Sequence, residues 1–494
     1  MQPIVDTKTM RNSDAETIRR GTSGRELMRR AGEGIFHSYA WHGPVAIVAG
    51  SGNNAGDGYV LAALLQRARI PCTLVLLSDL FSEDGAYYYG KCKEIGVKTE
   101  YFTEKTDFSS YAEIVDCIFG TGVHGRVEGI AHTAIEAINQ SGKTVISADI
   151  NSGLDGDNGL SELCVKSDLT VAIGFYKYGH FLGQAKDVIK NLACIDIGIG
   201  LFGSAVMLAE AADMASVLPP RRQDSHKGMY GYVSILGGCT EYAGAVKLAN
   251  LSCAALRAGC GVAKLIVPAS IASGVAPYLL ESTLAPLPDE NGHLLFDPDA
   301  LDAALKGQRA LAVGMGWGRS AQNAAILGHL LTNHSVPLVI DADGLNTLAE
   351  MDKKLLKETK CKIILTPHLK EMERLSGCPI AEIRRDPVGI AQAFAKEYGV
   401  CLLLKGSCTV VTDGEETYLV NRGCAGMATA GSGDVLSGIL AGLLGYADPT
   451  PLTVACGAYI AGRAGELAQE RLNPVSMIAS DTVAQIGAAI SELA

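Results

Sequence analysis

The sequence predicts an α/β protein of two domains, each built on a parallel sheet with helices on both faces. Three observations support this. The chain has 494 residues, more than one ordinary core accommodates. Short runs rich in valine and isoleucine alternate with helical patterns in both halves, as buried parallel strands do. The 57 glycines cluster after these runs without a fixed period, which is typical of loops at strand ends.

The first half opens with a helical segment, in which Leu27, Met28, Ala31 and Ile35 recur at helical spacing. The run VAIVAG at 45–50 predicts a strand. A helix is expected from about residue 58 to residue 68, followed by a strand in CTLVLLSD. Further strands are expected in IVDCIF, TVISADI and LTVAIGF. The alternation indicates an open parallel sheet covered on both faces.

The stretch LPPRRQDSHKGMYG interrupts this alternation with proline, glycine and charge. We place the domain junction between residues 212 and 223, which gives domains 1–212 and 213–494. The second half restarts with the strand GYVSILGG, a helix at about 243–258 and the strand VAKLIVP. Later strands are expected in ALAVGMG, PLVIDAD, KIILTP and CLLLKG. A hairpin that turns at Asp413-Gly414 follows, and apolar helices complete the chain.

Composition excludes several classes of protein. The formal net charge of −11, with no block of lysine and arginine, argues against a nucleic-acid partner. The 14 cysteines form no CxxC pair, so neither a zinc site nor a disulfide framework is expected. No apolar run approaches the roughly 18 to 20 residues of a membrane span, and the first residues do not resemble a signal peptide. We therefore expect a soluble, cytoplasmic protein with no membrane partner, and its apolar helices are consistent with a homo-oligomer.

The loop GSGNNAGDG after the first strand is the first candidate site. Gly50, Gly52 and Ala55 satisfy a dinucleotide-binding pattern, with Asp79 at the end of the next strand, and an NAD(P)-dependent oxidoreductase is one interpretation. A glycine-rich turn with capping side chains is the structural alternative. The oxygens of two asparagines and an aspartate also suit a cation or a ribose-phosphate.

Two later strands end in similar polar loops, DCIFGTGVHGR and SADINSGLDGDNG. The carboxyl ends of parallel strands converge on one crevice. One shared site is therefore expected to contain five polar residues: Asn54, Asp57, Asp116, Asp149 and Ser152.

These three loops, in this order, resemble the signature loops of the NAD(P)H-hydrate epimerase domain over most of residues 1–212. The resemblance implies a Rossmann-like three-layer αβα domain and a potassium ion held by Asn54, Asp116 and Ser152. It implies that Asp116 acts as acid/base, because a carboxylate beside a bound cation can shuttle a proton. Two departures from the family pattern are Ala55 for a glycine and Asn151 for a proline. The implied substrate-binding residues are Asn53, Asn54, Ala55, Gly56, Asp57, Gly120, Thr121, Gly122, Val123, His124, Gly125, Arg126 and Asp149.

The stretch MATAGSGDVLSG contains the second candidate site. An apolar helical stripe begins at Val435, so Asp434 lies at a helix start, where it could be a cap, a phosphate-site residue or a catalytic base. Amides of residues 430–433 would form an anion site helped by the helix dipole. Lys405, Gly406 and Thr409 follow another strand of this half and could supply further phosphate contacts. Two more strands end in polar groups, namely Asp341, Asp343, Asn346, His368 and Glu371.

Seven motifs follow one another in this half: HKGMYGYVSILGG, EYAGAVKLA, VGMGWG, DADGLN, TPHLKEM, KGSCTVV and NRGCAGMATAGSGDVLSGIL. In this order they resemble the ribokinase-like superfamily, and most closely its NAD(P)H-hydrate dehydratase domain, over nearly all of residues 213–494. The resemblance implies that Asp434 deprotonates the ring hydroxyl of the hydrate, which attacks the terminal phosphoryl group of ADP or ATP in the presence of Mg²⁺. The sequence departs from the family pattern in TPHLKE and in ATAGSGD. The hydrate is implied to contact Ala245, Gly318, His368 and Asp434, and the nucleotide to contact Lys405, Gly406, Ser407, Cys408, Thr409 and Gly433.

Together the two resemblances imply an enzyme that repairs hydrated NADH and NADPH by epimerising R- and S-hydrates and dehydrating the S-hydrate. One alternative keeps the second fold but makes it a thiazole- or pyridoxine-type small-molecule kinase with a degenerate N-terminal binding module. The sequence leaves open the choice between ADP and ATP and between the two hydrates.

Overall fold

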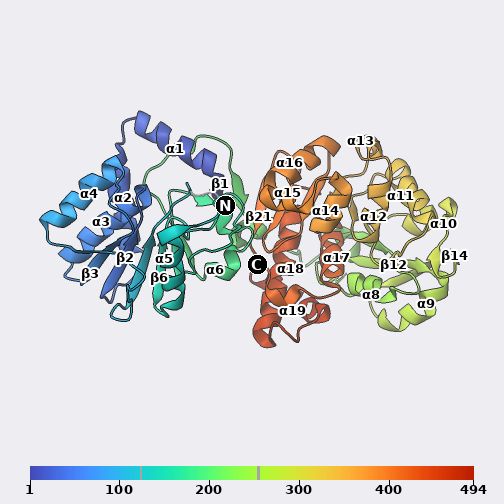
Figure 1. The fold of residues 1–494 in the computed structure, drawn as a ribbon. Coiled ribbons are helices and arrows are strands. Elements are labelled where there is room, and N and C mark those ends of the chain that lie inside the picture. Colours follow the sequence, from blue (N-terminus) through green and yellow to red (C-terminus); the bar gives the residue numbers. More distant parts are fainter. Residues whose placement is uncertain (123–124, 253–255, 494) are drawn as a thin grey trace. The chain divides into compact units, whose positions relative to one another are not determined.

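The computed structural model describes residues 1–122, 125–252 and 256–493, with the side chains of residues 251 and 252 left aside. The chain divides into two compact units, Pro3–Val206 and Met1–Gln2 with Met207–Ala494 (Figure 1). The second unit begins before the expected junction because strand β10 (Val206–Leu208) pairs in parallel with β21 (Thr417–Val420). No helix in the described part of the chain is long and apolar enough to cross a membrane.

The N-terminal unit is built on one sheet in which every pairing is parallel. The sheet is open and parallel as predicted. Chain order reverses between β2 and β5, so the loops after these two strands leave toward opposite faces of the sheet. A short parallel pair, β1 (Gln2–Val5) with β8 (Tyr176–Lys177), lies outside this sheet. The strand order is β4 (Lys98–Tyr101), β3 (Cys72–Leu76), β2 (Val45–Ala49), β5 (Glu113–Cys117), β6 (Thr144–Ala148), β7 (Leu169–Ile173) and β9 (Leu192–Ile195).

Alternation along β2 creates two separate cores, one on each face of this sheet. Val45 and Ile47 pack into the cluster that contains side chains of α2 and α3, whereas Ala46 and Val48 pack with α5. The three layers follow from this period of two in strands that are buried on both faces. The helices are α1 (Thr7–Arg19), α2 (Gly24–His37), α3 (Asn53–Arg67), α4 (Glu83–Glu94), α5 (Gly129–Gln140), α6 (Ala185–Val188) and the short η1 (Tyr178–His180).

Helix α3 starts earlier than the sequence predicted. Its N-cap is Gly52, so Asn53, Asn54 and Ala55 form its first turn instead of a loop. The predicted helix of Leu27, Met28, Ala31 and Ile35 is confirmed as α2, and all four side chains are buried.

The C-terminal unit has a larger sheet that is parallel from β13 to β19 and then antiparallel through the β20–β21 hairpin. The hairpin turns at Asp413-Gly414 as predicted, with Gly414 at a positive φ of 94°. A separate small hairpin joins β14 (Asp289–Glu290) and β15 (His293–Leu294). The order is β13 (Thr283–Leu287), β12 (Val262–Pro268), β11 (Tyr232–Leu236), β16 (Ala310–Val313), β17 (Leu338–Ile340), β18 (Ile363–Leu365), β19 (Cys401–Leu404), β20 (Thr409–Thr412), β21 and β10.

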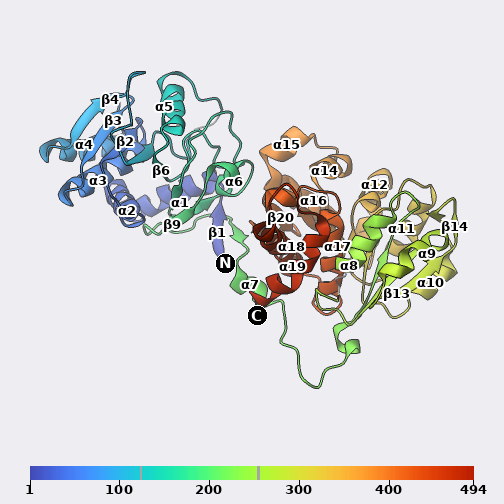
Figure 2. The same ribbon diagram turned by 90° about the horizontal axis from the view of Figure 1, so that it is seen from below.

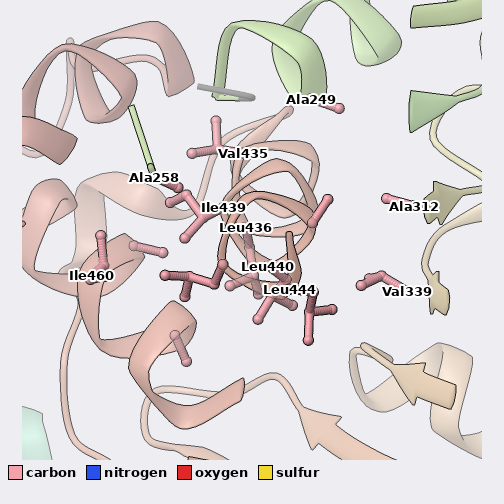
Figure 3. Packing of buried hydrophobic residues seen from close by; sticks show 14 of the residues in the cluster. Ala249, Ala258, Ala312, Val339, Val435, Leu436, Ile439, Leu440, Leu444 and Ile460 are labelled. Atoms are coloured by element: carbon pink, nitrogen blue, oxygen red, sulfur yellow. The ribbon is translucent and has the colours of Figure 1, made fainter. Parts of the chain in front are cut away.

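Helix α17 (Ser432–Leu444) occupies the centre of this unit's core, with every residue from Val435 to Leu444 buried. Figure 3 shows its apolar side chains between Ile460 on one side and Ala312 and Val339 of the sheet on the other. A helix that is apolar on all sides belongs inside a protein. The first turn of α17 lies where β17 and β19 end, because Gly433 approaches Asp341 and Lys405 there.

The remaining helices flank this sheet, and Figure 2 shows the same elements from a second direction. They are α7 (Ala211–Ala215), α8 (Ala243–Ser252), α9 (Ala269–Val275), α10 (Pro298–Leu305), α11 (Gln322–Asn333), α12 (Asp343–Glu350), α13 (Lys354–Glu358), α14 (Leu369–Ser376), α15 (Ile380–Arg385), α16 (Pro387–Tyr398), α18 (Pro451–Arg471) and α19 (Ala479–Ser491), with single turns η2 (Lys227–Tyr230), η3 (Ala276–Tyr278) and η4 (Ala425–Met427).

Candidate active sites

The N-terminal unit has a cavity of about 510 Å³ where β2 and β5 end. Such a point of reversed strand order is where open α/β sheets bind ligands. The expected convergence of the three polar loops takes place here. Among the predicted residues, the cavity is lined by Asn53, Asn54, Asp57, Gly120, Thr121, Gly122 and Asp149.

Other predicted substrate positions lie differently. Ala55 and Gly56 are buried in the first turns of α3 behind the cavity wall. Arg126 is exposed and forms an ion pair with Glu162 at 3.3 Å, and neither Arg126 nor Gly125 is among the described residues that line the cavity. Val123 and His124 lie outside the described residues.

Asp116 is fully buried at the end of β5 and does not line the cavity among the described residues. Its carboxylate accepts hydrogen bonds from the Ser152 amide (2.8 Å), the Ser152 hydroxyl (2.5 Å), the Ser147 hydroxyl (3.0 Å) and the Ile118 amide (3.2 Å). Burial raises the pKa of Asp116, and these hydrogen bonds offset part of that rise. This geometry favours holding the Ser152 loop over the acid/base role that we expected.

The side chain of Asn54 has a buried oxygen that accepts no hydrogen bond from the described residues. Its amide nitrogen donates to the Phe119 carbonyl at 2.7 Å, while Oδ1 has no hydrogen-bond partner among the described residues. The Ser152 hydroxyl, which accepts from the Phe119 amide at 2.8 Å, lies beside the same Phe119 peptide. An orphaned amide oxygen next to a hydroxyl and a carboxylate is a donor set that suits a hard cation such as potassium.

Three carboxyl groups of the cavity influence one another. Burial, and then the charges of Asp149 and Asp14, raise the pKa of Asp57 well above its ordinary value. Burial, and then Asp149, also raise the pKa of Asp14, which lines the cavity from α1. Burial and nearby like charge therefore both favour the protonated forms of Asp57 and Asp14.

Asp149 is held in place by groups that the sequence analysis did not single out. The Lys177 ammonium is completely buried, pairs with the Asp149 carboxylate and donates to the Ile173 carbonyl at 2.8 Å. His180 Nδ1 accepts from the Lys177 amide at 3.0 Å, so its Nε2–H donates to the Asp149 carbonyl at 2.8 Å. Burial and Lys177 lower the pKa of His180 to about 4, which keeps the ring neutral.

The two departures in this half fit their surroundings. Ala55 lies in the first turn of α3 and is not among the residues with positive φ, so a helix-favouring alanine is compatible there. Asn151 is fully buried, and its amide nitrogen donates to the Val165 and Val188 carbonyls at 2.8 and 3.1 Å. Its Oδ1 accepts from the Thr170 hydroxyl at 2.5 Å, so the side chain ties the loop to β7.

In the C-terminal unit, Asp434 occupies the third position of α17, and the N-cap is Gly431 with a positive φ of 94°. Asp434 is therefore not the N-cap of α17. Burial, followed by the charge of Asp341, raises the pKa of Asp434 to about 7, Lys405 opposes the rise and Asp343 adds to it. A carboxyl group with this pKa can accept a proton at neutral pH.

Lys405 and Asp341 form an ion pair beside this helix start. Burial alone would raise the pKa of Asp341, but Lys405 and the Ser437 hydroxyl, which donates at 2.7 Å, hold it below its ordinary value. Burial opposes the charge on Lys405, yet Asp341 and then Glu371 raise its pKa. A Cβ atom on Gly433 would lie 3.5 Å from both Asp341 Oδ2 and Lys405 Nζ, so the predicted nucleotide residues Gly433 and Lys405 do meet.

The rest of the predicted nucleotide segment, Gly406 to Thr409, forms the turn from β19 into β20 directly after Lys405. The Lys405 amide donates to the Pro367 carbonyl at 2.8 Å, and a parallel bridge links Lys405 with His368. The predicted turn is thereby placed next to the start of α14.

His368 is the N-cap of α14. Its Nδ1 accepts from the Lys370 and Glu371 amides at 3.1 and 3.2 Å, and the Glu371 carboxylate accepts from the His368 amide at 2.8 Å. This reciprocal capping uses backbone amides, so the altered LKE sequence preserves it. Because Nδ1 accepts, the ring proton is on Nε2, which lies 3.5 Å from Glu371 Oε1, and the half-exposed ring leaves room for a ligand to compete for this proton.

Gly318 lies on the wall of a second cavity of about 750 Å³, together with Arg319, Asp343 and Arg374. Its amide donates to Asp343 Oδ2 at 2.9 Å, and its φ of +65° suits glycine. Asp343 both lines this cavity and acts on the pKa of Asp434, so the cavity adjoins the site of α17. Ala245 packs beneath the same loop, because a Cβ atom on Gly316 would lie 3.0 Å from Ala245 Cβ.

Several contributors were missed. Ser437 could have been noticed as a hydroxyl inside an otherwise apolar helix. Lys177 and His180 could have been noticed as two polar side chains, in KYGH, after an apolar strand. Asp14 carries no comparable signal, because an acid on an amphipathic helix is common.

Comparison with known proteins assigns each unit separately. Residues 233–487 match the family model described as NAD(P)H-hydrate dehydratase, and residues 24–179 match the model described as YjeF-related protein N-terminus. The chain is 36% identical over 482 residues to the bifunctional NAD(P)H-hydrate repair enzyme of Moorella thermoacetica, covering 92% of this chain and 90% of that one. The chain belongs to the bifunctional NAD(P)H-hydrate repair enzyme family. Other members include those of Escherichia coli (32% identical, covering 92% of this chain and 87% of that one) and Coxiella burnetii (31%, covering 97% and 98%).

Solved structures agree for the C-terminal unit. An ADP/ATP-dependent NAD(P)H-hydrate dehydratase from Bacillus subtilis, co-crystallised with ATP and Mg²⁺, matches with a TM-score of 0.50 and 25% identity, covering 58% of this chain and 99% of that one. A ribokinase-like protein from Enterococcus faecalis matches with a TM-score of 0.52 at 22% identity, covering 60% and 99%, which shows the fold. The predicted ribokinase-like αβα architecture is confirmed.

Proposed function

We propose that this chain repairs hydrated NADH and NADPH in two steps, one in each unit. The N-terminal unit interconverts R- and S-hydrates, and the C-terminal unit uses ATP or ADP to return the S-hydrate to the reduced dinucleotide. The observation that carries the proposal is Asp434, a carboxylate with a pKa of about 7 at the start of a buried helix. Family membership over nearly the whole chain supports both activities.

Asp434 acts as the base in the dehydration. It takes the proton of the ring hydroxyl, whose oxygen attacks the terminal phosphoryl group of the Mg²⁺–nucleotide substrate and releases the shortened nucleotide. The carbon–oxygen bond then breaks, inorganic phosphate leaves, and the neighbouring ring carbon loses a proton to form the double bond. Lys405 and the amides of residues 431–433 stabilise charge on the phosphoryl oxygens.

The bulk of the dinucleotide lies in the cavity that contains Gly318. Its connection to Asp434 through Asp343 supports this placement, and the Nε2–H of His368 supplies a donor near the reacting end. The turn from Lys405 to Thr409 binds the phosphates of ATP or ADP, together with Gly433.

In the epimerase site, Asp149 and Asp57 form the acid/base pair. The buried Lys177 ammonium pairs with the Asp149 carboxylate, whereas burial raises the pKa of Asp57, and carboxyl groups in such different environments can serve as base and acid. Both line the cavity, whereas Asp116 is enclosed by its hydrogen-bond donors. Asp116 is a positioning residue in this proposal.

A potassium ion would be held by Asn54 Oδ1 and the Ser152 hydroxyl, with the Asp116 carboxylate, which accepts from Ser152, as the negative charge behind them. The orphaned Asn54 oxygen supports this assignment. A bound cation would supply a fixed positive charge that attracts phosphate or hydroxyl oxygens of the substrate.

No observation favours the kinase alternative. Its N-terminal half would be a degenerate binding module, yet Ala55 and Asn151 fit their local structures, and the family model for residues 233–487 describes a dehydratase.

The test is recovery of NADH absorbance from a mixture of R- and S-hydrates, with Mg²⁺, K⁺ and either ATP or ADP. The proposal predicts complete recovery with at least one nucleotide. Recovery of only the S-hydrate would refute the epimerase half, and no recovery with either nucleotide would refute the dehydratase half.

A further inference from the structure

Three side chains with metal-binding atoms converge between α10 and α11, apart from the residues proposed for either reaction. His329 Nε2 lies 2.8 Å from Asp302 Oδ1, and His334 Nε2 lies 3.0 Å from the same oxygen. The two imidazole rings are 5.7 Å apart between centroids. The histidine side chains are only 12% and 19% exposed, and Asp302 is 51% exposed, so the group is fixed on its protein side and open to solvent at the carboxylate.

The spacing of these atoms is close to that around a bound ion. In a tetrahedral zinc site, ligand bonds of about 2.0–2.1 Å place neighbouring ligand atoms roughly 3.3 Å apart. Here the three ligand atoms all lie within 4.8 Å of one another. Little movement is needed to bring them around one ion, which would replace the two N–H donations to Asp302.

We propose that Asp302, His329 and His334 form a binding site for a divalent transition-metal ion, with Zn²⁺ the best match. Two imidazoles and a carboxylate suit borderline ions, and water would complete the coordination. The ion would link α10 to the end of α11. Because Asn323 in the first turns of α11 donates to the Gly318 carbonyl at 3.0 Å, the linked helix also supports the Gly318 loop.

Asn333 gives this proposal a second test. Its Nδ2 lies 3.1 Å from His329 Nδ1, and a metal-bound His329 must carry its proton on Nδ1. The Asn333 amide would therefore rotate to present its oxygen. Carboxylate partners of metal-bound histidines strengthen binding, and changes in such partners alter affinity by about 10–100-fold. We expect Asn333→Asp to bind the ion more tightly.

The experiment uses the full chain, treated with a chelator and then titrated with Co²⁺ and Zn²⁺ near neutral pH. We expect one equivalent of Co²⁺ to give visible ligand-field bands without thiolate charge transfer, because none of the three proposed ligands is a cysteine. The described cysteines are all free, so a thiolate band would reveal competing binding at another place. Zn²⁺ should displace this Co²⁺ and raise Tm. The variants His329→Gln and His334→Gln should lose both effects while keeping the Tm of the metal-free protein.

His132→Gln is the matched control, because His132 contacts Glu136 at 3.4 Å on α5 but belongs to no group of three metal-binding side chains among the described residues. It should bind Co²⁺ like the wild type. The proposal is overturned if the wild type binds no Co²⁺, if both glutamine variants bind it as tightly as the wild type, or if the spectrum shows thiolate ligands.

Discussion

Lys405 Nζ lies 2.9 Å from Asp341 Oδ1, and this ion pair is set directly beside the helix start that carries Asp434. Only 3% of the Asp341 side chain and 22% of the Lys405 side chain are exposed. The pair places a fixed positive charge where phosphate is expected and a negative charge that raises the pKa of Asp434.

Replacing Lys405 by methionine should leave Asp341 as an unpaired buried charge. Removing one partner of a buried pair costs about 3–5 kcal/mol, and removing both costs far less. We therefore expect Lys405→Met to lower the urea midpoint of the C-terminal unit at pH 8, and Asp341→Asn with Lys405→Met to recover most of the loss. The loss should shrink as the pH falls, because burial without Lys405 raises the pKa of Asp341 in the variant and the protonated group needs no counter-charge. Equal midpoints for the single and double variants would contradict this account.

Dehydration should depend on pH through Asp434. The base acts only when ionised, so kcat/KM should rise with pH and reach half of its plateau near the pKa of about 7. Asp343 raises that pKa, and Asp343→Asn should therefore move the midpoint to lower pH while its amide oxygen can still accept from Gly318. A profile with no inflection between about pH 5.5 and pH 8.5, or a shift of the opposite sign in the variant, would exclude Asp434 as the base.

Much of the C-terminal site followed from the sequence because its strand–loop–helix order is local. The stripe beginning at Val435 indicates where α17 begins, and a small-residue loop before a buried helix indicates an anion site. The ion pair of Lys405 with Asp341 and the contact of Lys177 with Asp149 join residues from different strands. Such pairings depend on sheet order, which no local pattern in one sequence encodes.

Local patterns also misplaced some features. Glycine and asparagine are common in loops, so Asn53, Asn54 and Ala55 resembled a loop although they begin α3 on an N-cap of Gly52. The acid/base role of Asp116, inferred from its place at a strand end, stays a prediction. Its hydrogen bonds come from Ser147 in β6 and from Ser152 in the loop that follows β6, and no local pattern indicates them.

Asn54 should govern the response of the epimerase to potassium. Asn54→Leu removes the orphaned oxygen while keeping similar volume, so the stimulation of R-to-S conversion by KCl over choline chloride should disappear. KCl should also raise the Tm of the wild type but not that of the variant. A variant that retains both potassium effects would rule out this site, and Asn53→Leu, which leaves the orphaned oxygen intact, serves as the neighbouring control.

Alanine at position 55 should stabilise α3 without slowing epimerisation. Because it lies in α3 at a helical conformation, Ala55→Gly should destabilise the N-terminal unit by roughly 0.5–1 kcal/mol. We expect this variant to epimerise no faster than the wild type, as measured by chromatography of R- and S-hydrates. A substantial gain in rate would mean that the alanine impairs the substrate loop.

The most direct test of the central claim starts from pure R-hydrate of NADH with K⁺, Mg²⁺ and ATP or ADP, and follows R-hydrate, S-hydrate and NADH by chromatography. The wild type should convert R-hydrate through S-hydrate to NADH. Asp434→Asn should equilibrate the two hydrates at the wild-type rate yet form NADH at least about 10²-fold more slowly, the usual loss for a missing general base. NADH formation at the wild-type rate in the variant, or loss of epimerisation in a folded variant, would contradict the assignment of two separate reactions to the two units.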